Sequence, residues 1–306
     1  MALPQKVRIV EVGPRDGLQN EAASFDTQTR IELIRKLMLA GVSYIEAGAF
    51  VSPKWVPKMA DTALVLAPFD LSSNVDFAVL VPNLRGLDQA LEAGVQEIAV
   101  FGAASESFSQ KNINCSVAES IARFKPVCER AIENGLKVRG YISCVLGCPY
   151  EGDIDPNAVA AVTDQLFDQG CYEVSLGDTI GTGTARAASS LIELLSNRHS
   201  VEKLAVHFHD TYGQALANIY ASLEQGVQVI DSSVAGLGGC PYAPGAAGNV
   251  ATEDVVYLLN GLGIEHGINM DKLIDASEYI LSALDKTPTS RVSAAMLSKR
   301  QRAQVA

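Results

Sequence analysis

The chain has 306 residues, of which 48% are hydrophobic and 19% are charged, so it carries enough apolar side chains for a sizeable core and is not expected to be disordered. Its formal net charge of −11 argues against binding to nucleic acid or to anionic membrane surfaces, both of which select basic proteins. No stretch approaches the ~20 apolar residues of a membrane span and no targeting segment is recognisable at either end, so we expect a cytoplasmic protein.

Short β-branched runs alternate with longer amphipathic stretches along the whole chain. Strands are predicted at 8–12, 44–48, 77–81, 97–102, 138–144, 172–176, 204–209 and 227–233. Helices are predicted, among other places, at 27–41, 84–94, 116–135 and 157–170, and each of these ends on glycine, as a helix C-cap often does.

The number and spacing of these units indicate the fold. Three junctions repeat one phrase, "LAGVSYIE", "EAGVQEIAV" and "EQGVQVID", in which a helix ends at glycine and a strand soon follows. Eight such units, without a GxGxxG after the first strand, favour an α/β fold of the closed (β/α)₈ TIM barrel type over an open doubly wound sheet. We therefore expect one catalytic domain over 1–306, in which about 262–306 forms a helical extension packed on the barrel.

Polar residues at the carboxyl ends of the strands are the candidates for function, because barrel enzymes place their sites there. The residues that meet this criterion are "PRDG" after the first strand, Glu46 in the second, Tyr141 in the fifth, "GDT" after the sixth, "HFHD" at the end of the seventh, and the long loop after the eighth.

His207 and His209 lie two residues apart in a predicted strand, so both imidazoles point to the same face. Barrel closure brings Asp16, after the first strand, and Asn249, after the eighth, close to them. Two imidazoles, a carboxylate and an amide oxygen suit Mg²⁺ or Mn²⁺ with open positions for a substrate. Imidazole is a modest ligand for Mg²⁺, so Mn²⁺ or even Zn²⁺ could bind more tightly in vitro. The alternative is a pair of hydrogen-bonded histidines in the barrel core.

Arg15 precedes Asp16 and could stabilise an oxyanion on a substrate carbonyl. Glu46 lies in the apolar run "YIEAG", where an unpaired carboxylate is costly, so Arg15 is its expected partner. A purely structural ion pair is the alternative.

Cys240 lies in a glycine-rich loop that is too long for a routine connection, and it could act there as a proton donor or a nucleophile. The "GLGG" part of the same loop could instead bind phosphate. The other five cysteines are interpreted as reduced thiols, mostly in the core.

These segments together resemble the 3-hydroxy-3-methylglutaryl-CoA lyase family, within a wider superfamily of metal-dependent lyase and synthase barrels. The resemblance runs from about residue 5 to about residue 280, and its segments include "EVGPRDGLQNE", "RGYISCVLGCPYEG", "HFHDTYGQALAN" and "DSSVAGLGGCPYAPGAAGNVATEDVVY". The loop "GGCPYAPGAAGN" is its most specific part, because the wider superfamily is expected to lack the cysteine.

The resemblance implies cation-dependent cleavage of 3-hydroxy-3-methylglutaryl-CoA to acetyl-CoA and acetoacetate, the reaction of leucine degradation and ketone-body formation. It implies that the cation ligands are Asp16, His207, His209 and Asn249, and that the catalytic residues are Arg15, Asp16, Glu46, His207 and Cys240. Substrate contacts are implied for Arg15, Gln19, Asn112, Tyr141, Asp178 and Thr179. A homo-oligomer, a dimer or larger, is expected, with no nucleic-acid or membrane partner.

Three other functions are alternatives to this one. A Claisen-type synthase would run the condensation with a 2-oxo acid, but the Cys240 loop argues against it. A non-catalytic metal-binding or acyl-CoA-binding protein would bind ligand without turnover. A zinc amidohydrolase usually places its HxH after the first strand and needs further histidines, and neither His199 nor His266 falls at a strand end.

Overall fold

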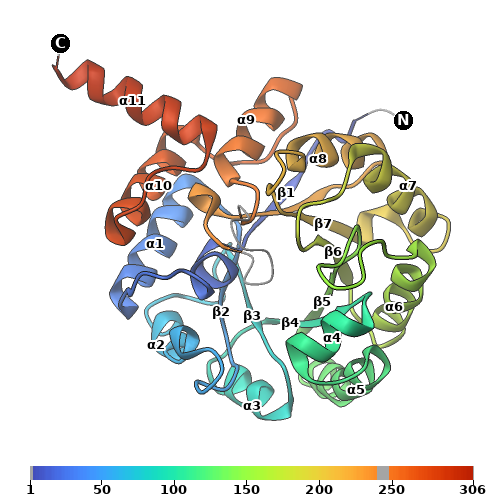
Figure 1. The fold of residues 1–306 in the computed structure, drawn as a ribbon. Helices are drawn as coiled ribbons and strands as arrows, with labels where there is room; N and C mark the ends of the chain where they lie inside the picture. The colour runs from blue at the N-terminus through green and yellow to red at the C-terminus, as the bar shows by residue number, and fades with distance from the viewer. Residues whose placement is uncertain (1–2, 240–247, 306) are drawn as a thin grey trace.

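The computed structural model describes residues 3–239 and 248–305, in which eight parallel strands close into a barrel surrounded by helices (Figure 1). The strands pair in chain order, and β8 returns to β1 with Ile9 opposite Ile230 and Glu11 opposite Ser232. The expected TIM barrel is therefore confirmed. The strands are β1 (Arg8–Glu11), β2 (Tyr44–Ala49), β3 (Asp76–Leu80), β4 (Glu97–Ala103), β5 (Lys137–Ser143), β6 (Glu173–Asp178), β7 (Leu204–Phe208) and β8 (Val229–Ser232).

Helices follow the strands on the outside of the barrel. They are α1 (Thr27–Ala40), α2 (Thr62–Leu66), α3 (Leu84–Glu92), α4 (Glu106–Ile113), α5 (Val117–Glu133), α6 (Pro156–Asp168), α7 (Ala185–Ser196), α8 (Ala215–Glu224), α9 (Thr252–Leu262), α10 (Met270–Leu284) and α11 (Arg291–Val305). Short helical turns lie at η1 (Gly13–Gly17), η2 (Pro57–Met59), η3 (Val201–Lys203) and η4 (Val234–Gly236). No helix among the described residues has both the length and the apolar content that a bilayer crossing requires.

The predicted boundaries agree with the structure because their signals are local. Every predicted strand is found within two residues of its expected ends, and α1 ends as expected at Gly41, which has a left-handed backbone with φ 94°. One difference bears on function. The strand expected over 204–209 ends at Phe208, and His209 instead forms an isolated bridge with Asn249, across which Val250 N donates to Phe208 O at 3.1 Å.

The core has two parts of different chemistry. A large apolar layer lies between the sheet and the helices, whereas the barrel interior holds only a small apolar cluster that includes Ala205 and Val229. Two residues further along the same strands, on the same inward face, come His207 and Asp231. The interior thus changes from apolar to ionic toward the carboxyl ends of the strands.

The C-terminal helices pack on one side of the barrel. Helix α10 lies against α1, and Asn269 N donates to Ala40 O at 2.7 Å where the two helices meet. Helix α11 contacts α9 and α10 and extends away from the barrel (Figure 1).

Candidate functional site

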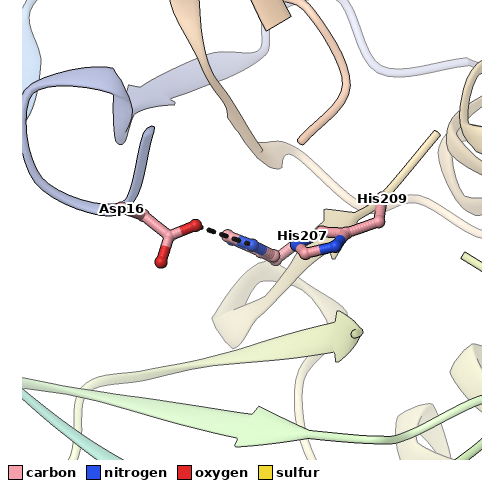
Figure 2. A group of neighbouring side chains, drawn as sticks. All are labelled: Asp16, His207 and His209. Atoms are coloured by element: carbon pink, nitrogen blue, oxygen red, sulfur yellow. Dashed lines mark ion pairs between the residues drawn. The ribbon is translucent and has the colours of Figure 1, made fainter. Parts of the chain in front are cut away.

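Asp16, His207 and His209 form a compact cluster at the carboxyl end of the barrel (Figure 2). Their candidate ligand atoms all lie within 4.8 Å of one another, and His207 Nε2 is 3.9 Å from Asp16 Oδ2. Asp16 comes from η1, His207 comes from β7, and His209 lies one residue beyond the end of β7. The sequence expectation that these residues meet is confirmed, and a carboxylate with two imidazoles is a donor set that divalent metals accept.

The ionisation states of Asp16 and His209 favour a bound cation. Burial would raise the pKa of Asp16, but the charges of Arg15 and His207 lower it to about 2. Burial and the neighbouring His207 lower the pKa of His209 to about 4, so this ring is neutral at physiological pH. Among the described residues, no group hydrogen-bonds to the buried His209 Nδ1. An ionised carboxylate and a neutral imidazole that leaves a ring nitrogen without a hydrogen-bond partner are groups that can bind a divalent cation, so the residues fit a metal site.

Asn249 adjoins this cluster through its amide nitrogen. Nδ2 donates to Asp16 Oδ2 at 2.8 Å and to Leu237 O at 3.2 Å. The structure thus brings Asn249 to the place expected from the sequence, but presents its NH₂ group to Asp16. A role of its oxygen as a cation ligand stays a prediction.

Arg15 lies beside the cluster and joins two carboxylates. Its Nε donates to Glu46 Oε2 at 2.7 Å and its Nη1 to Asp16 Oδ1 at 2.7 Å. Burial alone would lower the pKa of Arg15, but the charges of Glu46 and Asp16 outweigh it and raise this pKa. The expected pairing of Arg15 with Glu46 is therefore present, and it holds the guanidinium at the edge of the cluster.

The loop that carries Arg15 and Asp16 is a single π-helical turn, η1, packed against η4. Gly13 N and Val234 N both donate to Glu11 Oε1, at 2.8 and 2.9 Å, and thereby connect the two turns. A Cβ atom at Gly17 would lie 2.6 Å from Ser233 Oγ and 2.9 Å from Leu237 Cβ. The two glycines of "GPRDG" thus allow a close approach that brings Asp16 toward β7.

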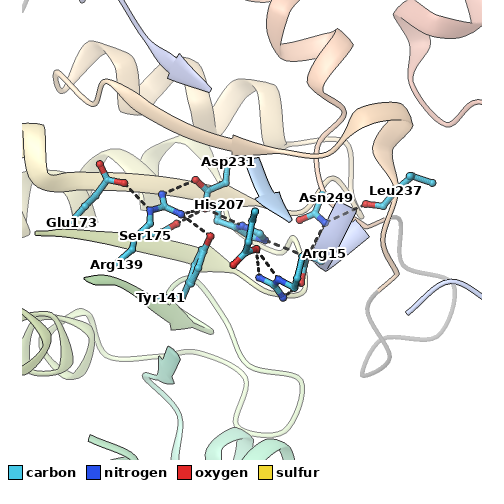
Figure 3. Close-up of polar contacts among 11 residues, drawn as sticks. Arg15, Arg139, Tyr141, Glu173, Ser175, His207, Asp231, Leu237 and Asn249 are labelled. Carbon is cyan, nitrogen blue, oxygen red and sulfur yellow. Dashed lines mark hydrogen bonds and ion pairs between the residues drawn. The ribbon is translucent and has the colours of Figure 1, made fainter. Parts of the chain in front are cut away.

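His207 has a buried acidic partner on the neighbouring strand. Its Nδ1 is 3.2 Å from Asp231 Oδ2, and Asp231 also pairs with Arg139 (Figure 3). Burial would lower the pKa of His207, but the hydrogen bond to Asp231 and the nearby carboxylates outweigh it and raise this pKa. The sequence filter for polar residues in apolar strands selected Glu46 but missed Asp231 and Arg139. The same signal, a charge inside "VQVIDSS" and "VRGYISC", could have found them.

A cavity of about 1240 Å³ opens beside the cluster. Eight of the residues singled out from the sequence line it, namely Arg15, Asp16, Gln19, Asn112, Tyr141, Thr179, His207 and His209. Apolar side chains such as Val51, Leu80 and Phe101 form part of its wall. Six of the eight, all but Gln19 and Asn112, are polar residues at predicted strand ends, so this criterion identifies residues of one site.

Other expected residues lie outside the cavity lining. Glu46 is fully buried behind Arg15. Asp178, at the end of β6, accepts from Gly183 N at 2.9 Å, and burial raises its pKa to about 6. Asp178 is therefore a support for the following loop in this structure, and direct contact with a substrate stays a prediction. Cys240 lies outside the described residues.

The comparisons with known proteins agree over nearly the whole chain. The family model described as HMGL-like matches residues 6–280. A relative from Pseudomonas aeruginosa, named 3-hydroxy-3-isohexenylglutaryl-CoA/hydroxy-methylglutaryl-CoA lyase, is 60% identical over 299 residues, which are 98% of this chain and 100% of the relative.

Solved structures show the same likeness. A crystal structure of hydroxymethylglutaryl-CoA lyase from Pseudomonas aeruginosa has a TM-score of 0.96 and 60% identity, over 98% of this chain and 100% of that chain. An HMG-CoA lyase from Acinetobacter baumannii, solved with coenzyme A and 3-methylmalate, has a TM-score of 0.90 and 33% identity, over 96% of each chain.

Proposed function

The chain belongs to the HMGL-like family, and from this premise we infer that it is a carbon–carbon lyase that cleaves 3-hydroxy-3-methylglutaryl-CoA to acetyl-CoA and acetoacetate. The observation that supports this best is the position of the Asp16–His207–His209 cluster and Arg15 on the wall of one large cavity. The physiological context that the family implies is leucine degradation and ketone-body formation.

We propose Mg²⁺ or Mn²⁺ as the cation, held by Asp16, His207 and His209, with Asn249 beside them. When bound, the cation supplies Lewis-acid polarisation of the substrate's C3 hydroxyl and carboxylate oxygens. The donor set supports this choice, because it has few charges and no thiolate among the described residues.

The protein's own residues carry the other steps. His207, if its Nε2 is only loosely ligated, is the candidate to accept the C3 hydroxyl proton, after which the C2–C3 bond breaks and leaves acetoacetate and the enolate of acetyl-CoA. Arg15 faces the cavity with its guanidinium fixed by Glu46, so it can stabilise the enolate oxygen without reorganising. Cys240 is proposed to donate the proton to the enolate carbon. We propose that Glu46, which is too deep to touch substrate, acts by holding Arg15.

Positively charged side chains that line the cavity are candidates to bind the phosphates of CoA. Arg85, Lys111 and Arg123 line the cavity of a chain whose net charge is −11. Replacing Lys111 or Arg123 by methionine should raise KM, with little change in kcat, because the phosphates lie far from the reacting carbons.

The test is a direct assay of acetoacetate and acetyl-CoA release from 3-hydroxy-3-methylglutaryl-CoA, with Mg²⁺, with Mn²⁺ and after chelation. Cation-dependent release is expected. Release that chelation leaves unchanged would contradict the metal site, whereas no release with any metal would contradict the activity and would direct attention to a condensing synthase. Cys240→Ser should slow release while leaving cation affinity unchanged, and loss of the cation would instead make Cys240 a ligand.

A second candidate substrate is 3-hydroxy-3-isohexenylglutaryl-CoA. The Pseudomonas aeruginosa relative is named for 3-hydroxy-3-isohexenylglutaryl-CoA as well, and the apolar wall that includes Val51, Leu80 and Phe101 favours an extended C3 substituent. We propose that this chain accepts both substrates. A kcat/KM for the isohexenyl substrate at least a thousand-fold lower would contradict this.

The organisation of the whole protein stays a proposal on three points. We propose one catalytic domain that includes the C-terminal helices, supported by the contacts of α10 with α1. A homo-oligomer and a cytoplasmic location are also proposed, and light scattering of the purified protein and fractionation of cells would test them.

A further inference from the structure

We propose that Asp231, clamped by Arg139 inside the barrel, is a positioning residue that holds His207 in the tautomer and orientation in which Nε2 faces Asp16. The inference rests on the proposed metal site for its purpose, but its structural content can be tested without metal.

Asp231 lies within hydrogen-bond distance of four side-chain atoms (Figure 3). Its Oδ1 accepts from Arg139 Nη2 at 2.7 Å, and its Oδ2 accepts from Arg139 Nη1 at 3.1 Å and from Ser175 Oγ at 2.8 Å. His207 Nδ1 lies 3.2 Å from the same Oδ2. An ionised carboxylate only accepts hydrogen bonds, so His207 must donate from Nδ1. In the neutral ring, Nε2 then carries the lone pair, and this atom faces Asp16 Oδ2 at 3.9 Å.

Arg139 keeps Asp231 in place and in its ionised form. The arginine and Asp231 are both fully or almost fully buried, and the guanidinium binds the carboxylate through two nitrogens. A second carboxylate, Glu173, accepts from Arg139 Nε at 2.7 Å. Since Nη1 of Arg139 also donates to Tyr141 Oη at 2.7 Å, one buried cation positions both a cavity-lining tyrosine and, through Asp231, a histidine of the cluster.

The two histidines of the cluster are therefore held by different means. His207 has a fixed acidic partner on its far side, whereas the buried His209 Nδ1 has no hydrogen-bond partner among the described residues. A substitution at Asp231 should consequently affect one imidazole and leave the other unchanged, which a general loosening of the barrel would not do.

The test compares Asp231→Asn with a matched control, Glu173→Gln. In Asp231→Asn, Arg139 attracts the oxygen of the new side-chain amide, which turns its NH₂ group toward His207 Nδ1. His207 Nδ1 must then accept a hydrogen bond instead of donating one. In the control, the same buried arginine loses a charged partner that does not touch His207, and Glu173 is similarly buried at 3% exposure.

The readout is two-bond ¹H–¹⁵N NMR of the histidine side chains, recorded without metal at alkaline pH. The chain has four histidines, and a His207→Gln sample assigns the signal. The wild-type protein and Glu173→Gln should show the proton on Nδ1, and Asp231→Asn should move it to Nε2. Mn²⁺ affinity, measured by electron paramagnetic resonance, should fall about 10–100-fold in Asp231→Asn and change less than about two-fold in the control.

Three outcomes would overturn the proposal. They are a wild-type proton on Nε2, an unchanged tautomer in Asp231→Asn, and an equal change in both variants. If wild-type protein binds no Mn²⁺, the metal site fails while the tautomer result still decides the role of Asp231.

Should Asp231→Asn not fold, the double variant Asp231→Leu, Arg139→Met replaces the ion pair by apolar groups and leaves Glu173 paired with Arg8. It should give mixed tautomers at His207, and retention of Nδ1–H alone would equally overturn the proposal.

Discussion

The guanidinium of Arg15 shows how one side chain can be both a structural and a chemical group. It neutralises the buried Glu46 and contacts Asp16, and it also lines the cavity. The ion pair and the proposed role in stabilising an enolate are therefore compatible, because the carboxylates fix the direction in which the guanidinium points. From the sequence alone, a structural ion pair and a chemical role for Arg15 are alternatives, whereas the geometry allows both.

Arg15→Gln should lower kcat about 10²–10³-fold while changing KM little, because enolate charge develops only in the transition state and the intermediate. The measurement is steady-state kinetics with saturating cation, and Arg15→Lys serves as a control that retains the charge beside Glu46. An effect on KM alone would refute the assignment.

Glu11 is a second residue whose ionisation the fold controls. Burial raises its pKa to about 8, well above the ordinary value of 4.5. The folded state thus retains a proton that the unfolded chain has lost between about pH 4.5 and pH 8, so the free energy of unfolding falls as pH rises through this interval. Above about pH 8 the Glu11 carboxyl is ionised in both the folded and the unfolded state, and this stabilising contribution is lost.

Glu11→Gln resembles the protonated form and should remove this dependence. The stability difference between wild type and Glu11→Gln should fall by up to about 1.4 kcal/mol per pH unit within the interval and become constant above it. Urea unfolding at pH 5.5, 7 and 8.5 measures this difference. A difference that is independent of pH would show that Glu11 is ionised throughout.

At the scale of elements, the active side of the barrel depends on two short turns, η1 and η4, that follow neighbouring strands. Glu11 accepts backbone hydrogen bonds from both turns, and Glu253, from α9, accepts from Ala235 N in η4 at 2.9 Å. Ala235 has a positive φ of 60°, which is unfavourable for a residue with a side chain. The buried carboxylates therefore hold a strained turn in register with the loop that carries Asp16.

Gly17→Ala should disturb this arrangement. The added methyl group would meet Ser233 Oγ and Leu237 Cβ, so η1 must shift, at a cost of about 1–3 kcal/mol in the free energy of unfolding. Mn²⁺ affinity should fall with it, because Asp16 moves away from the histidines.

Gly261→Ala is the matched control, because a Cβ atom at that position in α9 meets no atom within 4 Å. This variant should be as stable as the wild type or slightly more stable, since alanine favours helix. Denaturant unfolding and metal titration of both variants make the comparison. Equal metal affinity in the two would contradict the role of η1.

At the scale of the whole molecule, stability and the metal site are largely separate. The apolar layer between sheet and helices surrounds the barrel, and the interior ion pairs of Arg139 close its centre without using Asp16 or His209. The fold should consequently not require the cation.

Chelation should abolish activity while leaving the far-UV circular dichroism unchanged. Added cation should raise Tm by a few degrees, because a ligand that binds only the folded state stabilises it by about 2.7 kcal/mol at 100 times its Kd. Unfolding on chelation would mean instead that the metal is structural.

The sequence by itself determined the eight alternating units, the strand ends, His207 and His209 on one face, and the pairing of Arg15 with Glu46. These features depend on signals of local origin, namely periodicity, glycine at helix ends, and polar residues in apolar strands. Even there, the sequence placed His209 inside a strand, whereas the structure places it one residue beyond.

Only the tertiary structure decided which buried charges meet. Arg139 and Asp231 are 92 residues apart, and their contact across the interior depends on the strand register of the closed barrel. The direction of the Asn249 amide and the set of hydrogen-bond partners around Asp231 were decided in the same way. Sequence pattern places a side chain on a face, but its partner is fixed by the packing of residues from distant strands, and that packing decided how His207 is held.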